Sequence, residues 1–326
     1  MPKTHKKFDL LVIGSGPAGE AAAMNAAKAG KKVAIVSDKP RPGGNCTFLG
    51  TIPSKAIRYS VKQVIHFHTN PLLRDLCDMK KLTFQQALEN AERVIYEQSK
   101  SRLDAYERNN VPVFQGRACF IDTQQIEVTD GKIKTRLEAK NFILATGSRP
   151  YRPDDVDFDH PRVFDTDSIL QLKDTPKKVT IIGAGVIGCE YASIFGGMKM
   201  KVEMINPAET LLSFLDTEIT DALSYHLQNM GVRCRHQEHF SKLEYHDDHV
   251  VTYLESGKKI KSDIILWANG RTGNTDGLDL EAIGLAADSR GRLEVNKQYQ
   301  TKVENVYAAG DVIGWPSLAS SAYDQG

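Results

Sequence analysis

Apolar runs alternate with a helical pattern in two similar stretches of the chain. Residues 8–38, FDLLVIGSGPAGEAAAMNAAKAGKKVAIVSD, have the pattern of a strand, a glycine turn, an alanine-rich helix and a second strand. Residues 177–206, KKVTIIGAGVIGCEYASIFGGMKMKVEMIN, repeat that plan. Two such units predict two dinucleotide-binding cores, and therefore an α/β fold with two Rossmann-like domains.

Between these units the spacing of apolar residues predicts one long helix, from Thr83 to about Arg108, with Thr83 as a candidate N-cap. The residues expected on its buried face are Leu88, Ala91, Ile95, Ser99, Leu103 and Tyr106. Short alternating runs after this helix predict strands, with a hairpin turn at residues 130–131 and a turn at residues 256–257. A glycine turn followed by prolines predicts a domain boundary near Arg149.

Composition narrows the range of partners and compartments. A chain of 326 residues is long enough for two domains. Its 42 basic and 41 acidic residues nearly cancel, which argues against nucleic acid or a membrane surface as a partner. No apolar run approaches the roughly 20 residues of a spanning helix. Five scattered cysteines without a Cys-x-x-Cys motif predict no disulfide framework, and we expect the cytoplasm.

The two glycine motifs predict the geometry of nucleotide binding. In GSGPAG and GAGVIG the first glycine allows the turn, the second lets a pyrophosphate approach the backbone, and the third lets the helix pack on the strand. The pyrophosphate would lie at the helix N-terminus. The residues in these roles are Gly14, Gly16 and Gly19 in the first unit, and Gly183, Gly185 and Gly188 in the second.

The end of the second strand in each unit is expected to meet a ribose. An acidic residue is usual there, but the first unit ends in Ser37 followed by Asp38, and either could bind the hydroxyl. The second unit ends in Asn206, a neutral amide that tolerates NAD or NADP. Asn206 could equally do no more than begin the turn that follows.

Four histidines gather in HQEHFSKLEYHDDHV, residues 236–250. His-x-x-His can bind a metal, but this segment has the pattern of strands and a turn, and no cysteine or carboxylate motif completes the set. We interpret it as a solvated sheet face, and we expect no metal site.

Six motifs in order give the chain a clear family resemblance. GSGPAG, GGNCTFLGTIPSKA, ATG at residues 145–147, GAGVIGCE, GRTGNT and TKVENVYAAGD together resemble the FAD-dependent pyridine nucleotide–disulfide oxidoreductases. The resemblance covers essentially the whole chain. It implies an FAD domain formed by residues 1–150 and 277–326, with an NAD(P) domain, residues 151–276, inserted between them.

The resemblance also implies further site residues. It places Ala118 beside the adenine, Thr146 and Gly147 along the FAD, and Asp311 on the ribityl chain, although Asp311 could also be a helix N-cap. Gly44 and Gly270 lie within the shared motifs and are expected near the nucleotides. Lys55 and Glu190 match positions that form an ion pair where flavin and nicotinamide meet, and there the lysine would favour the reduced flavin.

One position departs from the disulfide-reducing pattern. Five residues after Cys46, where a second cysteine would close a disulfide, stands Thr51, which has no sulfur. A reduced flavin in this chain therefore has no dithiol relay. Cys46 is then a packing residue near the ring, or a peroxide-reactive thiol if Lys55 lowers its pKa.

The expected reaction is transhydrogenation. NADPH would reduce FAD and leave, and NAD⁺ would then occupy the same site and collect the hydride. The alternatives are an NAD(P)H oxidase or diaphorase, and a silent FAD- and NAD-binding module. Relatives continue with a C-terminal interface domain, so a homo-oligomer is expected for the full-length type and is doubtful for a fragment.

Overall fold

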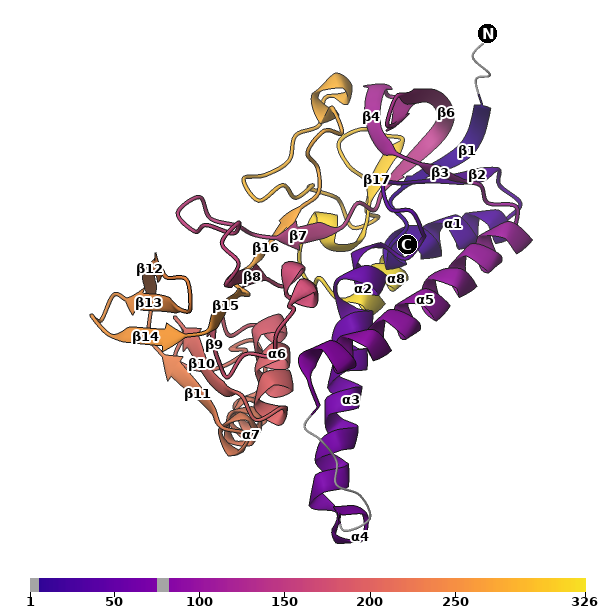
Figure 1. Cartoon of the computed structure of the whole chain (residues 1–326). Coiled ribbons are helices and arrows are strands. Elements are labelled where there is room, and N and C mark those ends of the chain that lie inside the picture. The colour runs from indigo at the N-terminus through magenta and orange to yellow at the C-terminus, as the bar shows by residue number, and fades with distance from the viewer. Residues whose placement is uncertain (1–5, 75–81) are drawn as a thin grey trace. The chain divides into compact units, whose positions relative to one another are not determined.

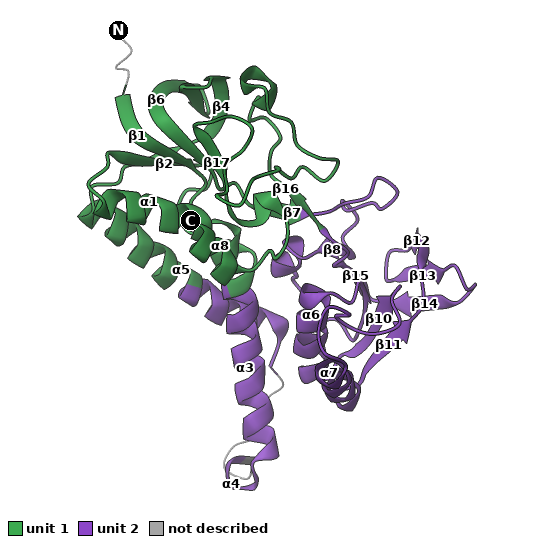
Figure 2. Cartoon of the chain, turned by 180° about the vertical axis from the view of Figure 1, so that it is seen from behind, with its two compact units in different colours: residues 1–51, 95–149, 271–326 green, residues 52–94, 150–270 purple. Residues whose placement is uncertain are grey.

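The computed structural model describes residues 6–74 and 82–326, and these form two compact units (Figures 1 and 2). Unit 1 comprises residues 1–51, 95–149 and 271–326, and unit 2 comprises residues 52–94 and 150–270. Cys77 lies outside the described residues. None of the helices in the described ranges is long and apolar enough to cross a bilayer.

Unit 1 is built on a seven-stranded sheet with the order β3-β2-β1-β6-β5-β4, and β17 also pairs with β6. Its strands are β1 (Lys6–Ile13), β2 (Val33–Ser37), β3 (Val113–Gln115), β4 (Arg117–Asp122), β5 (Gln125–Asp130), β6 (Ile133–Leu144) and β17 (Val306–Ala308). The neighbouring strands β3, β2, β1 and β6 are parallel, and β17 is parallel to β6. The strands β4, β5 and β6 form an antiparallel meander. A separate pair joins β7 (Ser148–Pro150) to β16 (Arg271–Gly273).

One face of the parallel strands is covered by helices (Figure 1). The helical elements of unit 1 are α1 (Pro17–Lys28), α2 (Gly44–Phe48), the second half of α5 (Phe84–Arg108), η2 (Leu280–Ile283), η3 (Gly310–Ile313) and α8 (Ala319–Gln325). The alanines of α1 and the buried Tyr106 of α5 join one apolar core with residues of β1 and β2. Small side chains on α1 therefore let the helix lie close to the strands.

Unit 2 repeats this architecture around a five-stranded parallel sheet with the order β11-β10-β9-β15-β8. Its strands are β8 (Val163–Asp165), β9 (Lys178–Ile182), β10 (Lys201–Asn206), β11 (Val232–His236) and β15 (Ile264–Trp267), and an antiparallel sheet adds β12 (Phe240–Tyr245), β13 (Val250–Leu254) and β14 (Lys259–Ser262). Its helices are α3 (Thr51–Thr69, from Ile52 onward), α4 (Pro71–Arg74), the first half of α5, η1 (Ser168–Gln171), α6 (Val186–Gly197) and α7 (Thr217–Asn229).

The largest core of unit 2 brings α3 and α5 against α6. Phe84 of α5 lies 5.7 Å from Phe195 of α6, measured between ring centroids, and Ile57 and Val61 of α3 are buried in the same cluster. Residues 52–94 therefore fold with the second glycine turn. The predicted domain boundaries did not include this packing, because an apolar stripe shows which face of a helix is buried but not what covers it.

The α/β fold with two Rossmann-like units, predicted from the two repeats, is confirmed. The hairpin turn at residues 130–131 and the turn at residues 256–257 are also confirmed, since Asp130 pairs with Ile133 and Gly257 donates its backbone N–H to Leu254 O at 2.9 Å.

The long helix begins with a reciprocal cap. The backbone N–H of Gln86 donates to Thr83 Oγ1 at 3.2 Å, and the backbone N–H of Thr83 donates to Gln86 Oε1 at 3.0 Å. Thr83 is therefore the N-cap that the sequence predicts. The predicted buried face was wrong at Leu103, which is exposed. Tyr106, three residues further on, is buried, so the cover extends past Leu103 and this leucine lies outside the covered stripe.

Candidate functional site

The first glycine turn joins β1 to α1 in unit 1. Gly14 has a φ of +112°, and a Cβ on it would lie 2.1 Å from Ala145 O. A Cβ on Gly19 would lie 2.0 Å from Gly14 O. Gly16 is the N-cap of α1, and no side chain caps this helix end. The first N–H groups of α1 and the positive end of its dipole are thus available to a pyrophosphate.

The loop before α2 lies directly on this turn. Gly44 has a φ of +58°, and a Cβ on it would lie 2.6 Å from Gly16 Cα. The backbone N–H of Gly43 donates to Ser15 O at 2.9 Å. The two glycine motifs of unit 1, distant in sequence, therefore meet at the start of α1.

Two buried hydroxyl groups near these motifs fit a polar cofactor. Thr47 Oγ1 and Thr146 Oγ1 are buried and have no hydrogen-bond partner among the described residues. Buried polar atoms rarely lack a partner unless a bound group supplies one. With the uncapped α1, they form a set of donors and acceptors that suits a dinucleotide. Thr146 and the following Gly147, with a φ of +69°, were both predicted along the FAD.

The end of β2 differs from the usual ribose site. Ser37 is buried and its hydroxyl oxygen lies 2.9 Å from that of Ser15, so this hydroxyl already has a partner in the protein. The adjacent Asp38 is exposed at the strand end. Of the two predicted ribose ligands, Asp38 is the more accessible. Ala118, predicted beside the adenine, is 6% exposed in β4 and belongs to the apolar core of unit 1.

Asp311 belongs to a polar network that the sequence did not predict. Ser148 donates to Asp311 Oδ2 at 2.8 Å, and Arg271 Nε donates to Ser148 Oγ at 2.7 Å. Asn45 Nδ2 donates to Ser148 O at 2.6 Å. The N-cap of η3 is Ala309, so the alternative reading of Asp311 as an N-cap was wrong. Arg271 lies inside the quoted motif GRTGNT, which was the only sign of it in the sequence.

Cys46 lies on α2 and forms a side-chain hydrogen bond with Thr51. Burial raises the pKa of the Cys46 thiol above its ordinary value of 9.0, although the Thr51 hydroxyl and the charge of Arg102 act in the opposite direction. The thiol is therefore mostly protonated at neutral pH. This favours the packing role over the peroxide-reactive one.

Alkylation of Cys46 by iodoacetamide is expected to be slower at pH 7.5 than that of a free cysteine, because only the thiolate reacts and the pKa of this thiol is raised. Since the pKa is raised, the rate should still increase with pH above 9. Peptide mass spectrometry would follow this site separately from the other cysteines. Thr51→Val, which removes the hydroxyl that lowers the pKa, should slow the reaction further. A rate that reaches its plateau below pH 8 would contradict the assignment.

The second glycine turn, in unit 2, has the same construction as the first. Gly183 has a φ of +106°, and a Cβ on it would lie 2.6 Å from Ala268 O. A Cβ on Gly188 would lie 2.1 Å from Gly183 O. Gly185 is the N-cap of α6, with no side-chain cap and no atom within 4 Å of its would-be Cβ. Gly270, with a φ of +100°, follows β15, which pairs with β9.

Asn206 ends β10 and its side chain is buried. Its amide forms hydrogen bonds with Thr210, Ala208 and His236, which are close in unit 2. It therefore does begin the turn that follows the strand, which was one of its two predicted roles.

The predicted pair of Lys55 and Glu190 is brought together within unit 2. Lys55 stands in the first turns of α3 and Glu190 in α6, and Lys55 Nζ donates to Glu190 Oε1 at 2.5 Å. The Glu190 side chain is 18% exposed and the Lys55 side chain 64%. The carboxylate is thus partly buried beneath an accessible ammonium group, an arrangement in which the lysine can present its charge to a ligand.

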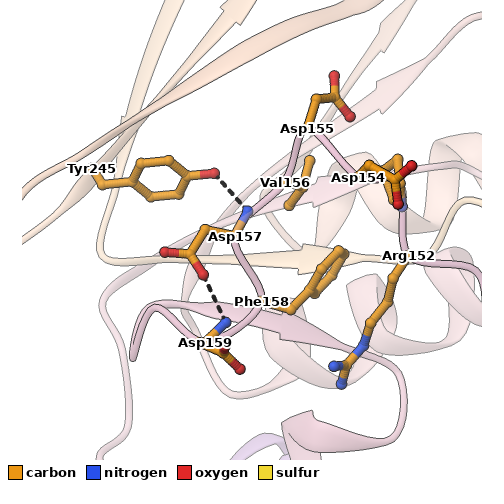
Figure 3. A pocket seen from close by; sticks show the side chains of 9 residues that line it. Arg152, Asp154, Asp155, Val156, Asp157, Phe158, Asp159 and Tyr245 are labelled. Carbon is orange, nitrogen blue, oxygen red and sulfur yellow. Dashed lines mark hydrogen bonds between the residues drawn. The ribbon is translucent and has the colours of Figure 1, made fainter.

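Two other polar features of unit 2 do not suit a nucleotide. A pocket beside Tyr245 is lined by four carboxylates and one cation, Arg152, so that its net negative charge opposes a pyrophosphate (Figure 3); the carboxylates are Asp154, Asp155, Asp157 and Asp159. The Tyr245 hydroxyl accepts the backbone N–H of Asp157 at 2.9 Å. The rings of His246 and His249 stack 4.2 Å apart, and the described part of the chain holds no group of three metal-ligating side chains.

Comparison with known proteins identifies the family. The model of the pyridine nucleotide-disulphide oxidoreductases matches residues 8–326. The chain belongs to this family. A protein named soluble pyridine nucleotide transhydrogenase from Azotobacter vinelandii is 57% identical over 321 residues, which are 98% of this chain and 69% of that protein. Proteins of the same name from Stutzerimonas stutzeri and Pseudomonas aeruginosa are 56% and 55% identical, with the same coverage.

A solved structure also supports the fold. The Cu(II) complex of the HOCl-induced flavoprotein disulfide reductase RclA from Escherichia coli has a TM-score of 0.86 and 27% sequence identity to this chain. The match covers 98% of this chain and 69% of that one. The family and this flavoprotein neighbour imply FAD as the cofactor, in agreement with the polar set around α1.

Proposed function

We propose that this chain is an FAD-dependent transhydrogenase, which transfers hydride from NADPH to NAD⁺. The observation that carries the proposal is Thr51, whose hydroxyl binds Cys46 where a disulfide reductase needs a second thiol. The relatives at 55–57% identity bear the matching name. Bound FAD supplies a group that accepts a hydride from one nicotinamide and gives it to another.

The residues of each unit have separate tasks. In unit 1, the N-terminus of α1 and the hydroxyls of Thr47 and Thr146 would hold FAD, with Asp38 on a ribose and Asp311 on the ribityl chain. In unit 2, the N-terminus of α6 would hold the nicotinamide nucleotide. Because the described residues of unit 2 contain one such turn, NADP⁺ would have to leave before NAD⁺ binds, which gives ping-pong kinetics.

Lys55 and Glu190 would act as the pair that tunes the flavin. The ammonium group of Lys55 favours the electron-rich reduced cofactor, and Glu190 fixes the position of the lysine. We place the protein in the cytoplasm, because the described cysteines are all free, as is usual in a reducing compartment. The homo-oligomer stays a prediction.

Anaerobic stopped-flow absorbance on the purified yellow protein tests the function. NADPH should bleach the flavin band, and NAD⁺ should restore it without oxygen. Recovery with oxygen alone would indicate an oxidase, and the absence of bleaching would indicate a silent module. Cys46→Ser should retain most of the turnover, whereas a disulfide reductase would lose it. Dithiol turnover, with a long-wavelength thiolate–flavin band, would overturn the proposal.

A further inference from the structure

The side chain of Asn206 is locked in one orientation at the end of β10. Its Nδ2 donates to Thr210 O and to His236 Nδ1, both at 3.0 Å, and its Oδ1 accepts the backbone N–H of Ala208 at 3.2 Å. A carbonyl oxygen can only accept and a backbone N–H can only donate. The Thr210 and Ala208 bonds therefore establish which end of the amide is nitrogen.

This network leaves Asn206 only one kind of bond to offer a ligand. An amide has two hydrogens, and both are used within the protein, while Oδ1 retains one of its two lone pairs. A ribose hydroxyl can donate a hydrogen bond to that lone pair. A 2′-phosphate carries about 1.5 to 2 negative charges at pH 7 and acts mainly as a hydrogen-bond acceptor. It therefore cannot form a favourable hydrogen bond with Asn206 Oδ1, which is also an acceptor.

The charges near the end of β10 also disfavour a 2′-phosphate. Residues 206–216, NPAETLLSFLD, contain no lysine or arginine, and Glu209 is exposed within them. Lys201 begins β10, five residues before Asn206, which places it about 16 Å away along a parallel strand. A 2′-phosphate at the end of β10 would thus meet an acid and no nearby base from this strand or the loop after it.

The cations of the neighbouring β11 already have partners. Arg235 Nε binds Glu203 Oε2 at 2.7 Å, and Arg233 Nη1 lies 3.6 Å from Glu203 Oε1. The two arginines of β11 therefore share one carboxylate, Glu203, which offsets part of their charge. His236 accepts the hydrogen bond from Asn206 Nδ2 at its Nδ1, so this nitrogen is already used within the protein.

We propose that the nicotinamide nucleotide site of unit 2 prefers NAD(H) to NADP(H). Asn206 is the acceptor for the adenosine ribose, and Glu209 is the repulsive element. The inference rests on the proposed function, because a transhydrogenase must bind both nucleotides. The site therefore binds both nucleotides and differs only in its affinity for them, because specificity is a difference of affinities.

The test compares the anaerobic reduction of the flavin by NADH and by NADPH in the purified protein. We expect kcat/KM for NADH to exceed that for NADPH by about tenfold or more, which corresponds to at least about 1.4 kcal/mol. Raising the salt concentration should leave this ratio unchanged or reduce it, since salt screens the repulsion between Glu209 and the phosphate. A ratio of one or less, or a ratio that grows with salt as lysine or arginine contacts would require, overturns the proposal.

Two matched variants locate the effect. Glu209→Lys should lower the NADH to NADPH ratio by about tenfold or more, and Glu209→Gln by about threefold, because the first reverses the charge and the second only removes it. Equal ratios in both variants and the original protein would remove Glu209 from the proposal and overturn it. If NADH is preferred but NAD⁺ fails to reoxidise the flavin, the proposed function fails and the preference stands. If NAD⁺ reoxidises the flavin but NADH is not preferred to NADPH, the proposed function stands and the preference fails.

Discussion

Replacement of Lys55 by glutamine is expected to slow the reduction of the flavin by NADPH about 10²- to 10³-fold, the usual cost of removing a group that stabilises developing negative charge. Lys55 Nζ lies 2.5 Å from Glu190 Oε1, and the lysine side chain is 64% exposed. An exposed ion pair stabilises a fold by at most about 1 kcal/mol, so the variant should fold. The loss would then be catalytic.

Stopped-flow rates should be measured with a matched control on the same helix. Lys62→Gln removes the same charge from an exposed position of α3, and it should change the rate little. The flavin midpoint potential should fall in Lys55→Gln and stay unchanged in Lys62→Gln. If both variants lose equal amounts of activity, the loss comes from the change in net charge, and the role proposed for Lys55 and Glu190 is contradicted.

Glu190→Gln distinguishes positioning from direct action. The lysine keeps its charge but loses the partner that fixes it, so a loss of about tenfold is expected, less than that of Lys55→Gln. In the double variant the losses should not add, because Glu190 has no lysine left to position. This non-additivity would be missing if the two residues acted independently.

The parts of the fold that sequence predicts are those set by local pattern. The glycine turns, the strands beside them and the Thr83 cap depend on neighbours within a few residues, and each has a distinct spacing. The two glycine turns also share a backbone hydrogen bond. Gly14 N–H donates to Val36 O in unit 1, and Gly183 N–H donates to Ile205 O at the equivalent position of unit 2. Similar sequences produced the same backbone path.

The parts that sequence does not predict depend on partners distant in the chain. The hydroxyl of Ser37 binds Ser15, and Asp311 receives a hydrogen bond from Ser148, which itself binds Arg271. Each of these residue types has several possible partners, and only the folded chain selects one. For the same reason the free lone pair of Asn206 follows from its contacts and not from its being an asparagine.

Gly185→Ala is expected to leave the stability of the protein unchanged within about 0.5 kcal/mol, yet weaken binding of the nicotinamide nucleotide by about 10²-fold or more. The φ of Gly185 is −76°, which any residue adopts, and its would-be Cβ has no protein atom within 4 Å. That open space lies at the uncapped start of α6, where a pyrophosphate must approach the backbone. A methyl group there costs the folded chain nothing and obstructs the ligand.

Gly188→Ala, three residues further on, should behave in the opposite way. Its Cβ would lie 2.1 Å from Gly183 O, a backbone atom that cannot move without disturbing the turn. We expect a loss of about 3 kcal/mol or more in the free energy of unfolding, at the upper end for overpacking. Urea unfolding and nucleotide titration of both variants separate the two effects.

The first turn offers the same comparison for FAD. The would-be Cβ of Gly16 has Gly44 Cα at 3.9 Å as its nearest neighbour, whereas that of Gly19 lies 2.0 Å from Gly14 O. Gly16→Ala should therefore fold and lose its yellow colour, and Gly19→Ala should lose stability. If Gly16→Ala keeps FAD and Gly185→Ala keeps its nucleotide affinity, then the glycines serve only the turns, and neither helix N-terminus binds a pyrophosphate.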